Sequence, residues 1–137
     1  MPIEVLQSLV GIPYARCGRT PVGLDCWGLV MAASARLGTP IPDYFAGHTD
    51  RTVSECQAAV AGLQQFLNPD HWVPVQGAGQ PGDVLAFRNP QGIVDHAGVV
   101  IDETWFLHAL AGAGVVKARR AADPWCRVLA GVYAYRP

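Results

Sequence analysis

Apolar residues recur at the spacing of an α-helix in three segments of the first half of the chain. The segments cover residues 3–10, 25–37 and 52–67. The middle segment is the best defined, because Asp25 is suited to cap its start and Gly38 to end it. Its apolar stripe, at positions i, i+3, i+4, i+7 and i+11, consists of Cys26, Leu29, Val30, Ala33 and Leu37. The pattern predicts three amphipathic helices, the first of them ended by Gly11.

The second half of the chain changes to short segments rich in Val, Phe, Trp and Tyr, separated by Gly, Pro, Asn and Asp. Predicted strands cover residues 83–88, 94–101, 105–110, 115–119 and 129–135. Helices followed by strands favour an α+β fold in which the helices pack on an antiparallel sheet. Residues 39–51 form a long predicted loop that could border a cleft. Residues 1–137 suit a single domain.

Composition and charge exclude several classes of function. Half of the residues are apolar, 15% are charged and the net charge is −1. The sequence contains no basic stripe that would indicate a nucleic-acid partner, and no apolar run long enough to span a membrane. The first residues lack the basic-then-apolar form of a secretory signal, so we expect synthesis in the cytoplasm and cysteines that remain thiols.

Cys26 is the first candidate for chemistry, because it follows Asp25 at the start of a predicted helix. Unpaired backbone N–H groups and the helix dipole favour an anion at this position. A thiolate is the reactive form of cysteine, and such positions lower its pKa from about 8.5. The same N–H groups could stabilise the oxyanion of a tetrahedral intermediate. The alternative is that Cys26 is one more small apolar residue of the stripe.

His96 and His108 lie on two neighbouring predicted strands, and both numbers are even. An odd hairpin loop of three or five residues centred on Asp102 would place them opposite each other on one face. We predict this loop, because a two-residue loop would turn one histidine away. Facing imidazoles beside a cysteine suit nucleophilic catalysis. The first imidazole takes the thiol proton, and the second orients the first. Either histidine alone could also be a half-buried packing residue.

Other residues receive weaker interpretations. The Tyr14 hydroxyl could donate to the oxyanion or to substrate, or simply pack. Cys17 lies on a loop that must pass near Cys26, where it could form a wall or a reversible disulfide with it. Together with Asp25 and Trp27, these two residues are candidates for contact with the oxyanion or the substrate. Packing roles are assigned to Cys56 and Cys126.

Three blocks of sequence resemble the NlpC/P60 family, the papain-like cell-wall peptidases. The first runs from the Gly-Ile-Pro-Tyr of residues 11–14 to the Gly-Leu-Asp-Cys-Trp-Gly-Leu-Val of residues 23–30. The second joins Gln-Pro-Gly-Asp-Val-Leu at residues 80–85 to Asp-His-Ala-Gly-Val at residues 95–99, and the third is Phe-Leu-His-Ala at residues 106–109. The blocks span nearly the whole chain in the order of the family.

The resemblance implies a helix that carries the cysteine and packs on a five- to six-stranded antiparallel sheet. It implies Cys26 as nucleophile, His96 as general base and His108 as the orienting third residue, with Tyr14 as the tyrosine near the active site. The implied reaction is hydrolysis of peptidoglycan stem peptides, commonly between D-γ-glutamyl and a diamino acid. No metal or organic cofactor is implied.

Two departures from the family pattern point to one branch of it. Trp27 stands where many members have serine, and Cys17-Gly18 where many have Gly-Gly. The tryptophan and the small size resemble the phage-tail branch, which implies other tail proteins as partners and a place in the virion tail. The alternatives are a structural tail protein with a vestigial site, an amidase or acyltransferase using the same Cys-His pair, and a metal site of Cys26, His96 and His108.

Overall fold

The computed structural model describes residues 2–44 and 68–137, and its first part contains two helices separated by a short ribbon. Helix α1 (Pro2–Gln7) is shorter than predicted, and turns carry the chain to Gly11, whose φ of +97° is left-handed. A two-stranded ribbon, β1 (Arg19–Thr20) and β2 (Gly23–Leu24), follows. Next comes α2 (Cys26–Arg36). The helix predicted for residues 52–67 lies outside the described residues.

Helix α2 begins and ends where the sequence predicts. The Asp25 side chain accepts a hydrogen bond from the Gly28 N–H at 2.7 Å, which confirms it as the N-cap. Leu37 is the C-cap, and Gly38 follows with a φ of +87°, as a residue that ends a helix commonly does. The apolar stripe is buried, apart from partly buried Leu37 at the end.

The sheet has six antiparallel strands in the order β3-β8-β4-β5-β6-β7. The strands are β3 (Trp72–Pro74), β4 (Val84–Arg88), β5 (Val94–Val100), β6 (Trp105–Leu110), β7 (Gly114–Arg119) and β8 (Leu129–Tyr135). Five were predicted to within a residue at each end, and the α+β class is confirmed. The sixth, β3, has only three residues and pairs with the end of the chain, so local pattern gave no sign of it.

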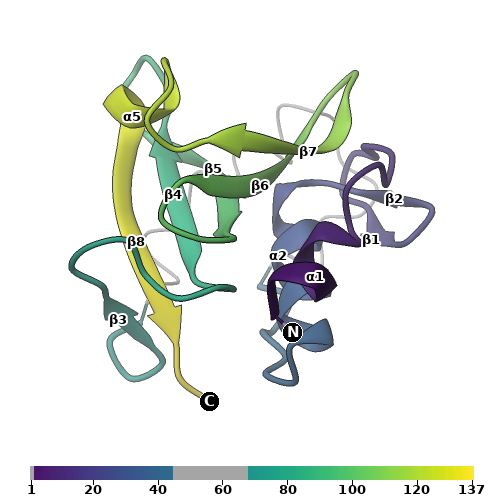
Figure 1. The fold of residues 1–137 in the computed structure, drawn as a ribbon, viewed down its shortest axis with the longest axis horizontal. Coiled ribbons are helices and arrows are strands. Elements are labelled where there is room, and N and C mark those ends of the chain that lie inside the picture. The colour runs from purple at the N-terminus through teal and green to yellow at the C-terminus, as the bar shows by residue number, and fades with distance from the viewer. Residues whose placement is uncertain (1, 45–67) are drawn as a thin grey trace.

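The sheet is covered on both faces (Figure 1). The larger core lies between α2 and one face, where Trp27, Leu29, Val99 and Leu107 pack together. A smaller core on the other face contains Phe87 and is covered by α5 (Trp125–Val128), a short helix that the sequence did not predict. Within the described residues, no helix has the length and apolarity needed to cross a bilayer.

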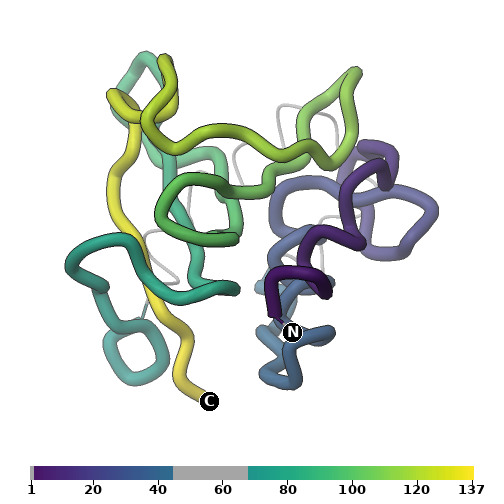
Figure 2. Tube along the Cα trace, viewed as in Figure 1, coloured from purple at the N-terminus to yellow at the C-terminus, as the bar shows by residue number. Residues whose placement is uncertain are grey.

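The N-terminal part and the far end of the sheet are joined by backbone hydrogen bonds. The Gly11 N–H donates to the Val115 carbonyl, and the Val115 N–H donates to the Ile12 carbonyl. In the chain trace, the turn between β6 and β7 reaches across to the N-terminal segment (Figure 2). This connection places the loop that carries Tyr14 and the start of α2 beside the strands that carry the histidines.

Candidate active site

The Cys26 sulfur lies at the first turn of α2, where it is 6% exposed and meets two backbone donors. One is the N–H of Trp27, an N–H of the first turn that has no partner within the helix. The other is the N–H of Ala97 on β5, the residue directly after His96. The start of the helix and the histidine strand are therefore in contact at the sulfur.

The N–H of Ala97 is available because β5 separates from β6. The Val100 N–H donates to the Asp83 carbonyl, and the Val100 carbonyl accepts from the Gly82 N–H, both on the β4 side. Along an antiparallel strand, successive residues direct their backbone N–H groups to alternate sides. The Ala97 N–H, three residues earlier, therefore points toward β6. Pairing of β5 with β6 covers only Val99 with Leu107 and Val100 with Phe106. Ala97 is not among these pairs, and its N–H meets the Cys26 sulfur instead.

A β-bulge sets the direction of His96. Arg88 pairs with Val94 but Phe87 pairs with His96, so Asp95 is an extra residue, and its carboxylate accepts a hydrogen bond from Asn89. The bulge reverses the alternation of side chains along the strand. Val94 and Ala97 consequently both join the core beneath α2, and His96 faces the other side beside Phe87.

The hairpin of β5 and β6 has the odd loop that the sequence predicts, but its centre is one residue later. Val100 pairs with Phe106, so five residues centred on Glu103 form the connection. The prediction that His96 lies directly opposite His108 is therefore wrong by two residues, because Gly98 holds that position. The two imidazoles nevertheless meet, because the His96 Nε2 lies 2.9 Å from Nδ1 of His108. Both imidazoles lie on one face, as predicted.

An aromatic enclosure surrounds the two histidines. His108 is 1% exposed and meets the Trp125 ring edge-on at 4.5 Å between centroids, and His96 lies 5.8 Å from the same ring. Burial lowers the pKa of His96 to about 4, and burial with the charge of His96 lowers that of His108 to about 3. Trp125 was not predicted to belong to the site, because its only signal in the sequence is an aromatic residue next to a proline.

The pKa of Cys26 differs from the prediction. We expected the helix start to lower it, but burial and the neighbouring Asp25 carboxylate raise the pKa to about 12. The N–H groups of Ala97 and Trp27 and the charge of Arg19 act in the opposite direction without overcoming burial. Burial therefore favours the neutral form of the Cys26 thiol and of both imidazoles.

Asp25 was a candidate for contact with the oxyanion or the substrate, and the structure gives its carboxylate other partners. Its Oδ1 accepts from the Gly28 N–H and from Arg19 Nη1, at 2.7 and 2.6 Å, and the residue is 5% exposed. Gly28 is required nearby, because a Cβ there would lie 2.1 Å from the Gly18 carbonyl oxygen. The loop before α2 is thus packed directly on its first turn.

Tyr14 lies close enough to Cys26 for their charges to interact. Its backbone bridges to Leu24, just before the helix, and its pKa is raised by burial and then by the charges of Cys26 and Asp25. The side chain is half-buried. Donation by its hydroxyl to the oxyanion or the substrate stays a prediction.

Trp27 and Cys17 also differ from their predicted roles. The Trp27 side chain is fully buried, and its indole donates to the Pro42 carbonyl at 3.2 Å, so only its backbone N–H reaches the site. Cys17 is disulfide-bonded, whereas Cys26 is free, so the predicted thiol and the reversible disulfide with Cys26 are both wrong. Its φ of +56° is unusual for a side-chain-bearing residue. Cys126 is exposed rather than packed.

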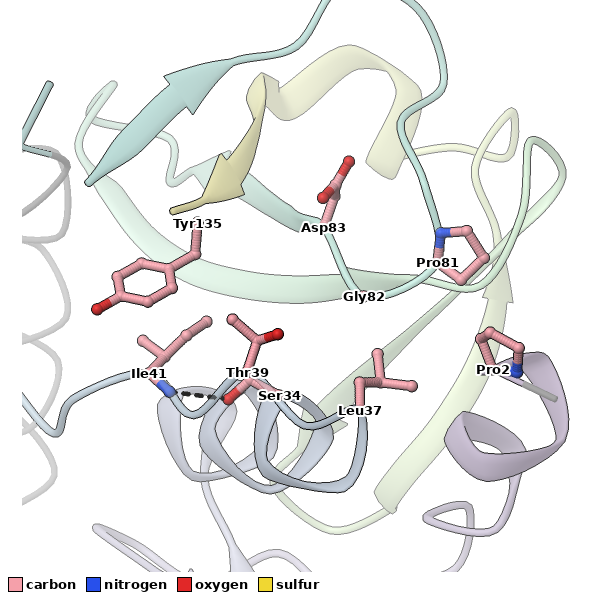
Figure 3. A pocket seen from close by; sticks show the side chains of 9 residues that line it. All are labelled: Pro2, Ser34, Leu37, Thr39, Ile41, Pro81, Gly82, Asp83 and Tyr135. Carbon is pink, nitrogen blue, oxygen red and sulfur yellow. Dashed lines mark hydrogen bonds between the residues drawn. The ribbon is translucent and has the colours of Figure 1, made fainter. Parts of the chain in front are cut away.

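A cavity of about 290 Å³ lies at the other end of α2 from Cys26 (Figure 3). Ser34 and Thr39 line one side and Asp83 the other, and burial raises the pKa of the Asp83 carboxyl. Eleven-residue α2 separates this cavity from the sulfur. Among the residues that the structure describes, no group of three or more His, Cys, Asp or Glu side chains is arranged to hold a metal ion.

Comparison with known proteins adds a family to this geometry. The family model described as NlpC/P60 family matches residues 11–133. A relative named "probable endopeptidase" from Mycobacterium tuberculosis (strain H37Rv) is 33% identical over 107 residues, which are 78% of this chain and 22% of the relative. The chain thus spans about a fifth of the length of the curated relative.

Solved structures show the same fold. An NlpC/P60 family protein from Bacillus cereus aligns with a TM-score of 0.72 and 24% identity, over 99% of this chain and 39% of the other. The NlpC/p60 domain of the peptidoglycan hydrolase SagA aligns with a TM-score of 0.54 and 19% identity, over 86% of each chain. At these identities the likeness establishes the fold alone.

Proposed function

The chain belongs to the NlpC/P60 family, and from that premise we propose that it is a cysteine peptidase that hydrolyses stem peptides of bacterial peptidoglycan. One observation carries the proposal. The Cys26 sulfur meets the N–H of Ala97, next to His96, and the His96 Nε2 lies 2.9 Å from His108 Nδ1. The names of the mycobacterial relative and of SagA support a hydrolase of the cell wall.

The proposed reaction begins from the neutral pair. His96 takes the thiol proton as the thiolate of Cys26 attacks the carbonyl carbon of the scissile bond, and His108 holds the imidazole in position. The tetrahedral oxyanion accepts hydrogen bonds from a backbone N–H at the start of α2 and from the Tyr14 hydroxyl. The C–N bond then breaks, and His96 gives its proton to the leaving amine. A thioester remains.

Water completes the cycle. His96 removes a proton from the water as its oxygen attacks the thioester carbonyl, and the C–S bond breaks to release the acid and the thiol. The raised pKa of Cys26 and the lowered pKa of His96 favour a neutral thiol and a neutral imidazole before the attack. We place the cleaved bond between D-γ-glutamyl and the diamino acid, on the resemblance of the three sequence blocks to the family.

Defined muropeptides test this proposal. The parent protein is expected to release fragments whose masses identify a cut between D-γ-glutamyl and the diamino acid, and Cys26→Ala is expected to abolish the release. Cys126→Ser is the matched control, because Cys126 is also a free thiol but is exposed on α5. Release at another amide would favour the amidase or acyltransferase alternative, and a folded but inactive parent would favour a structural role.

We also propose that the domain acts as part of a phage or prophage tail. The support is Trp27, which stands where many members of the family have serine. Its side chain is buried in the core beside Tyr44. Mass spectrometry of purified tail particles is expected to find this chain together with other tail proteins. Particles that lack the chain, in cells that contain it in the cytoplasm, would contradict the assignment.

A further inference from the structure

Arg19 connects three parts of the protein around the start of α2. Its Nη1 donates to Asp25 Oδ1 at 2.6 Å and to the Gly18 carbonyl at 2.9 Å, and its Nε donates to Asp43 Oδ2 at 3.0 Å. The Arg19 and Asp25 side chains are only 19% and 8% exposed. This is a largely desolvated ion pair, in which removal of one partner leaves a charge without compensation.

Asp25 presents the site with an electrostatic conflict. Its carboxylate caps α2, and it directly precedes the residue that must become a thiolate. Two anions on adjacent residues repel each other, and the Asp25 charge raises the pKa of Cys26. Arg19 binds the same Oδ1 that caps the helix, and its charge acts on the Cys26 pKa in the opposite direction.

The second arm of Arg19 reaches the segment that borders Trp27. Asp43 follows Pro42, whose carbonyl accepts the Trp27 indole N–H, and Tyr44 lies 5.6 Å from the Trp27 ring. The guanidinium thereby holds the residues on both sides of the nucleophile's first helical turn. The backbone at Gly18 also packs directly against that turn, since a Cβ at Gly28 would lie 2.1 Å from the Gly18 carbonyl oxygen.

We propose that Arg19 is a positioning residue of the Cys26 site, which neutralises the Asp25 cap and ties it to Asp43 so that a thiolate can form beside a carboxylate. The inference rests on the proposed role of Cys26 as nucleophile. Besides Asp25 and Arg19, Tyr14 from the preceding loop interacts with Cys26, and the N–H of Ala97 contacts its sulfur from β5. His96 and His108 lie on the sheet face covered by α5. Arg16 is exposed, and its charge acts to lower the pKa of Tyr14.

The test measures alkylation of Cys26 by iodoacetamide against pH, in a Cys126→Ser background that removes the exposed free thiol. Arg19→Gln is expected to raise the midpoint of alkylation by about one pH unit, the order expected for one charge in a protein-like dielectric. It is also expected to lower kcat for muropeptides more than it raises KM. Arg19→Lys should recover part of both, because the charge returns without the fork of donors.

Two further variants separate charge from architecture. Arg19→Gln combined with Asp25→Asn should return the midpoint to near the parent value, because both charges are gone and asparagine still caps a helix. Asp43→Asn, which keeps the Asp25 pair, should leave the midpoint unchanged. Should Arg19→Gln fail to fold, Asp25→Asn alone decides: the proposal expects a lower midpoint, because the positive charge of Arg19 is then unopposed.

The proposal is overturned by an Arg19→Gln midpoint equal to that of the parent, by an Asp43→Asn shift of the same size, or by a midpoint in Asp25→Asn that does not fall. Alkylation reports on the thiol without any peptide hydrolysis. A parent protein that cuts no muropeptide would therefore overturn the proposed function, while the shifts in midpoint would still decide the role of Arg19.

Discussion

The residues of this site derive their properties from their neighbours. Cys26 stands at a helix start, which favours a thiolate, yet burial and Asp25 raise its pKa to about 12. His96 is a histidine with its pKa lowered to about 4 by burial, so it stays neutral and able to accept a proton at neutral pH. The residue types alone would have suggested a resting ion pair, and the burial of both groups reverses that expectation.

His108 is expected to act through His96 rather than on substrate. Its Nδ1 lies 2.9 Å from the His96 Nε2, and it is fully buried against Trp125. His108→Ala should lower kcat for muropeptide hydrolysis by about 10²- to 10⁴-fold, the order found when an orienting residue of a catalytic triad is lost. His108→Asn should retain more activity, because an amide can still bind the imidazole.

The matched control for this substitution is His71→Ala. His71 is exposed beside Tyr135 and Arg136, and it is expected to leave kcat unchanged. Far-ultraviolet circular dichroism on each variant would show that the fold is retained. A His108→Ala protein with kcat within threefold of the parent would contradict an orienting role.

At the level of elements, the first turn of α2 is fixed by a close approach of backbone to backbone. Alanine in place of a helical glycine usually stabilises a protein by up to about 1 kcal/mol. Gly28→Ala is expected to destabilise this one by about 1–3 kcal/mol, because its Cβ would lie 2.1 Å from the Gly18 carbonyl oxygen. Urea unfolding would measure the difference in the free energy of unfolding.

Ala35→Gly provides the comparison on the same helix. Ala35 is exposed near the end of α2, so the change should cost only the difference in helix propensity, about 1 kcal/mol. The two substitutions are opposite in chemistry, and both are expected to destabilise. A Gly28→Ala protein as stable as the parent would show that the loop can move away from α2.

Elements with a strong local signal were predictable from the sequence, and features set by distant contacts were not. The period of apolar residues, Asp25 and Gly38 located α2, and alternation and turn residues located five strands. The bulge at Asp95 and the pairing that puts Gly98 opposite His108 depend on how β4, β5 and β6 meet. Arg19 gave no signal either, because its partners Asp25 and Asp43 lie on different segments.

At the scale of the whole molecule, the site lies where the helical part meets the sheet. Cys26 comes from α2 and its sulfur meets the Ala97 N–H of β5, while the histidines lie on the sheet face covered by α5. Gly11 and Ile12 form backbone hydrogen bonds with Val115 of β7, which join the N-terminal part to the far end of the sheet. Relative movement of the two parts would separate Cys26 from the strand that carries His96, so we expect the proposed activity to depend on global stability.

Global stability is accordingly expected to fall in mild acid. The folded-state pKa values of His96 and His108, about 4 and about 3, lie below the ordinary value of 6.5. As the pH falls below 6.5, the unfolded chain binds protons that the folded protein does not, so the free energy of unfolding decreases, and the loss continues down through these two values. The urea midpoint of the parent should therefore be clearly lower at pH 5 than at pH 7. A His96→Asn/His108→Asn protein should lose less over the same interval, whereas His71→Ala should lose as much as the parent. An equal decrease in the parent and the double variant would show that other groups govern acid unfolding.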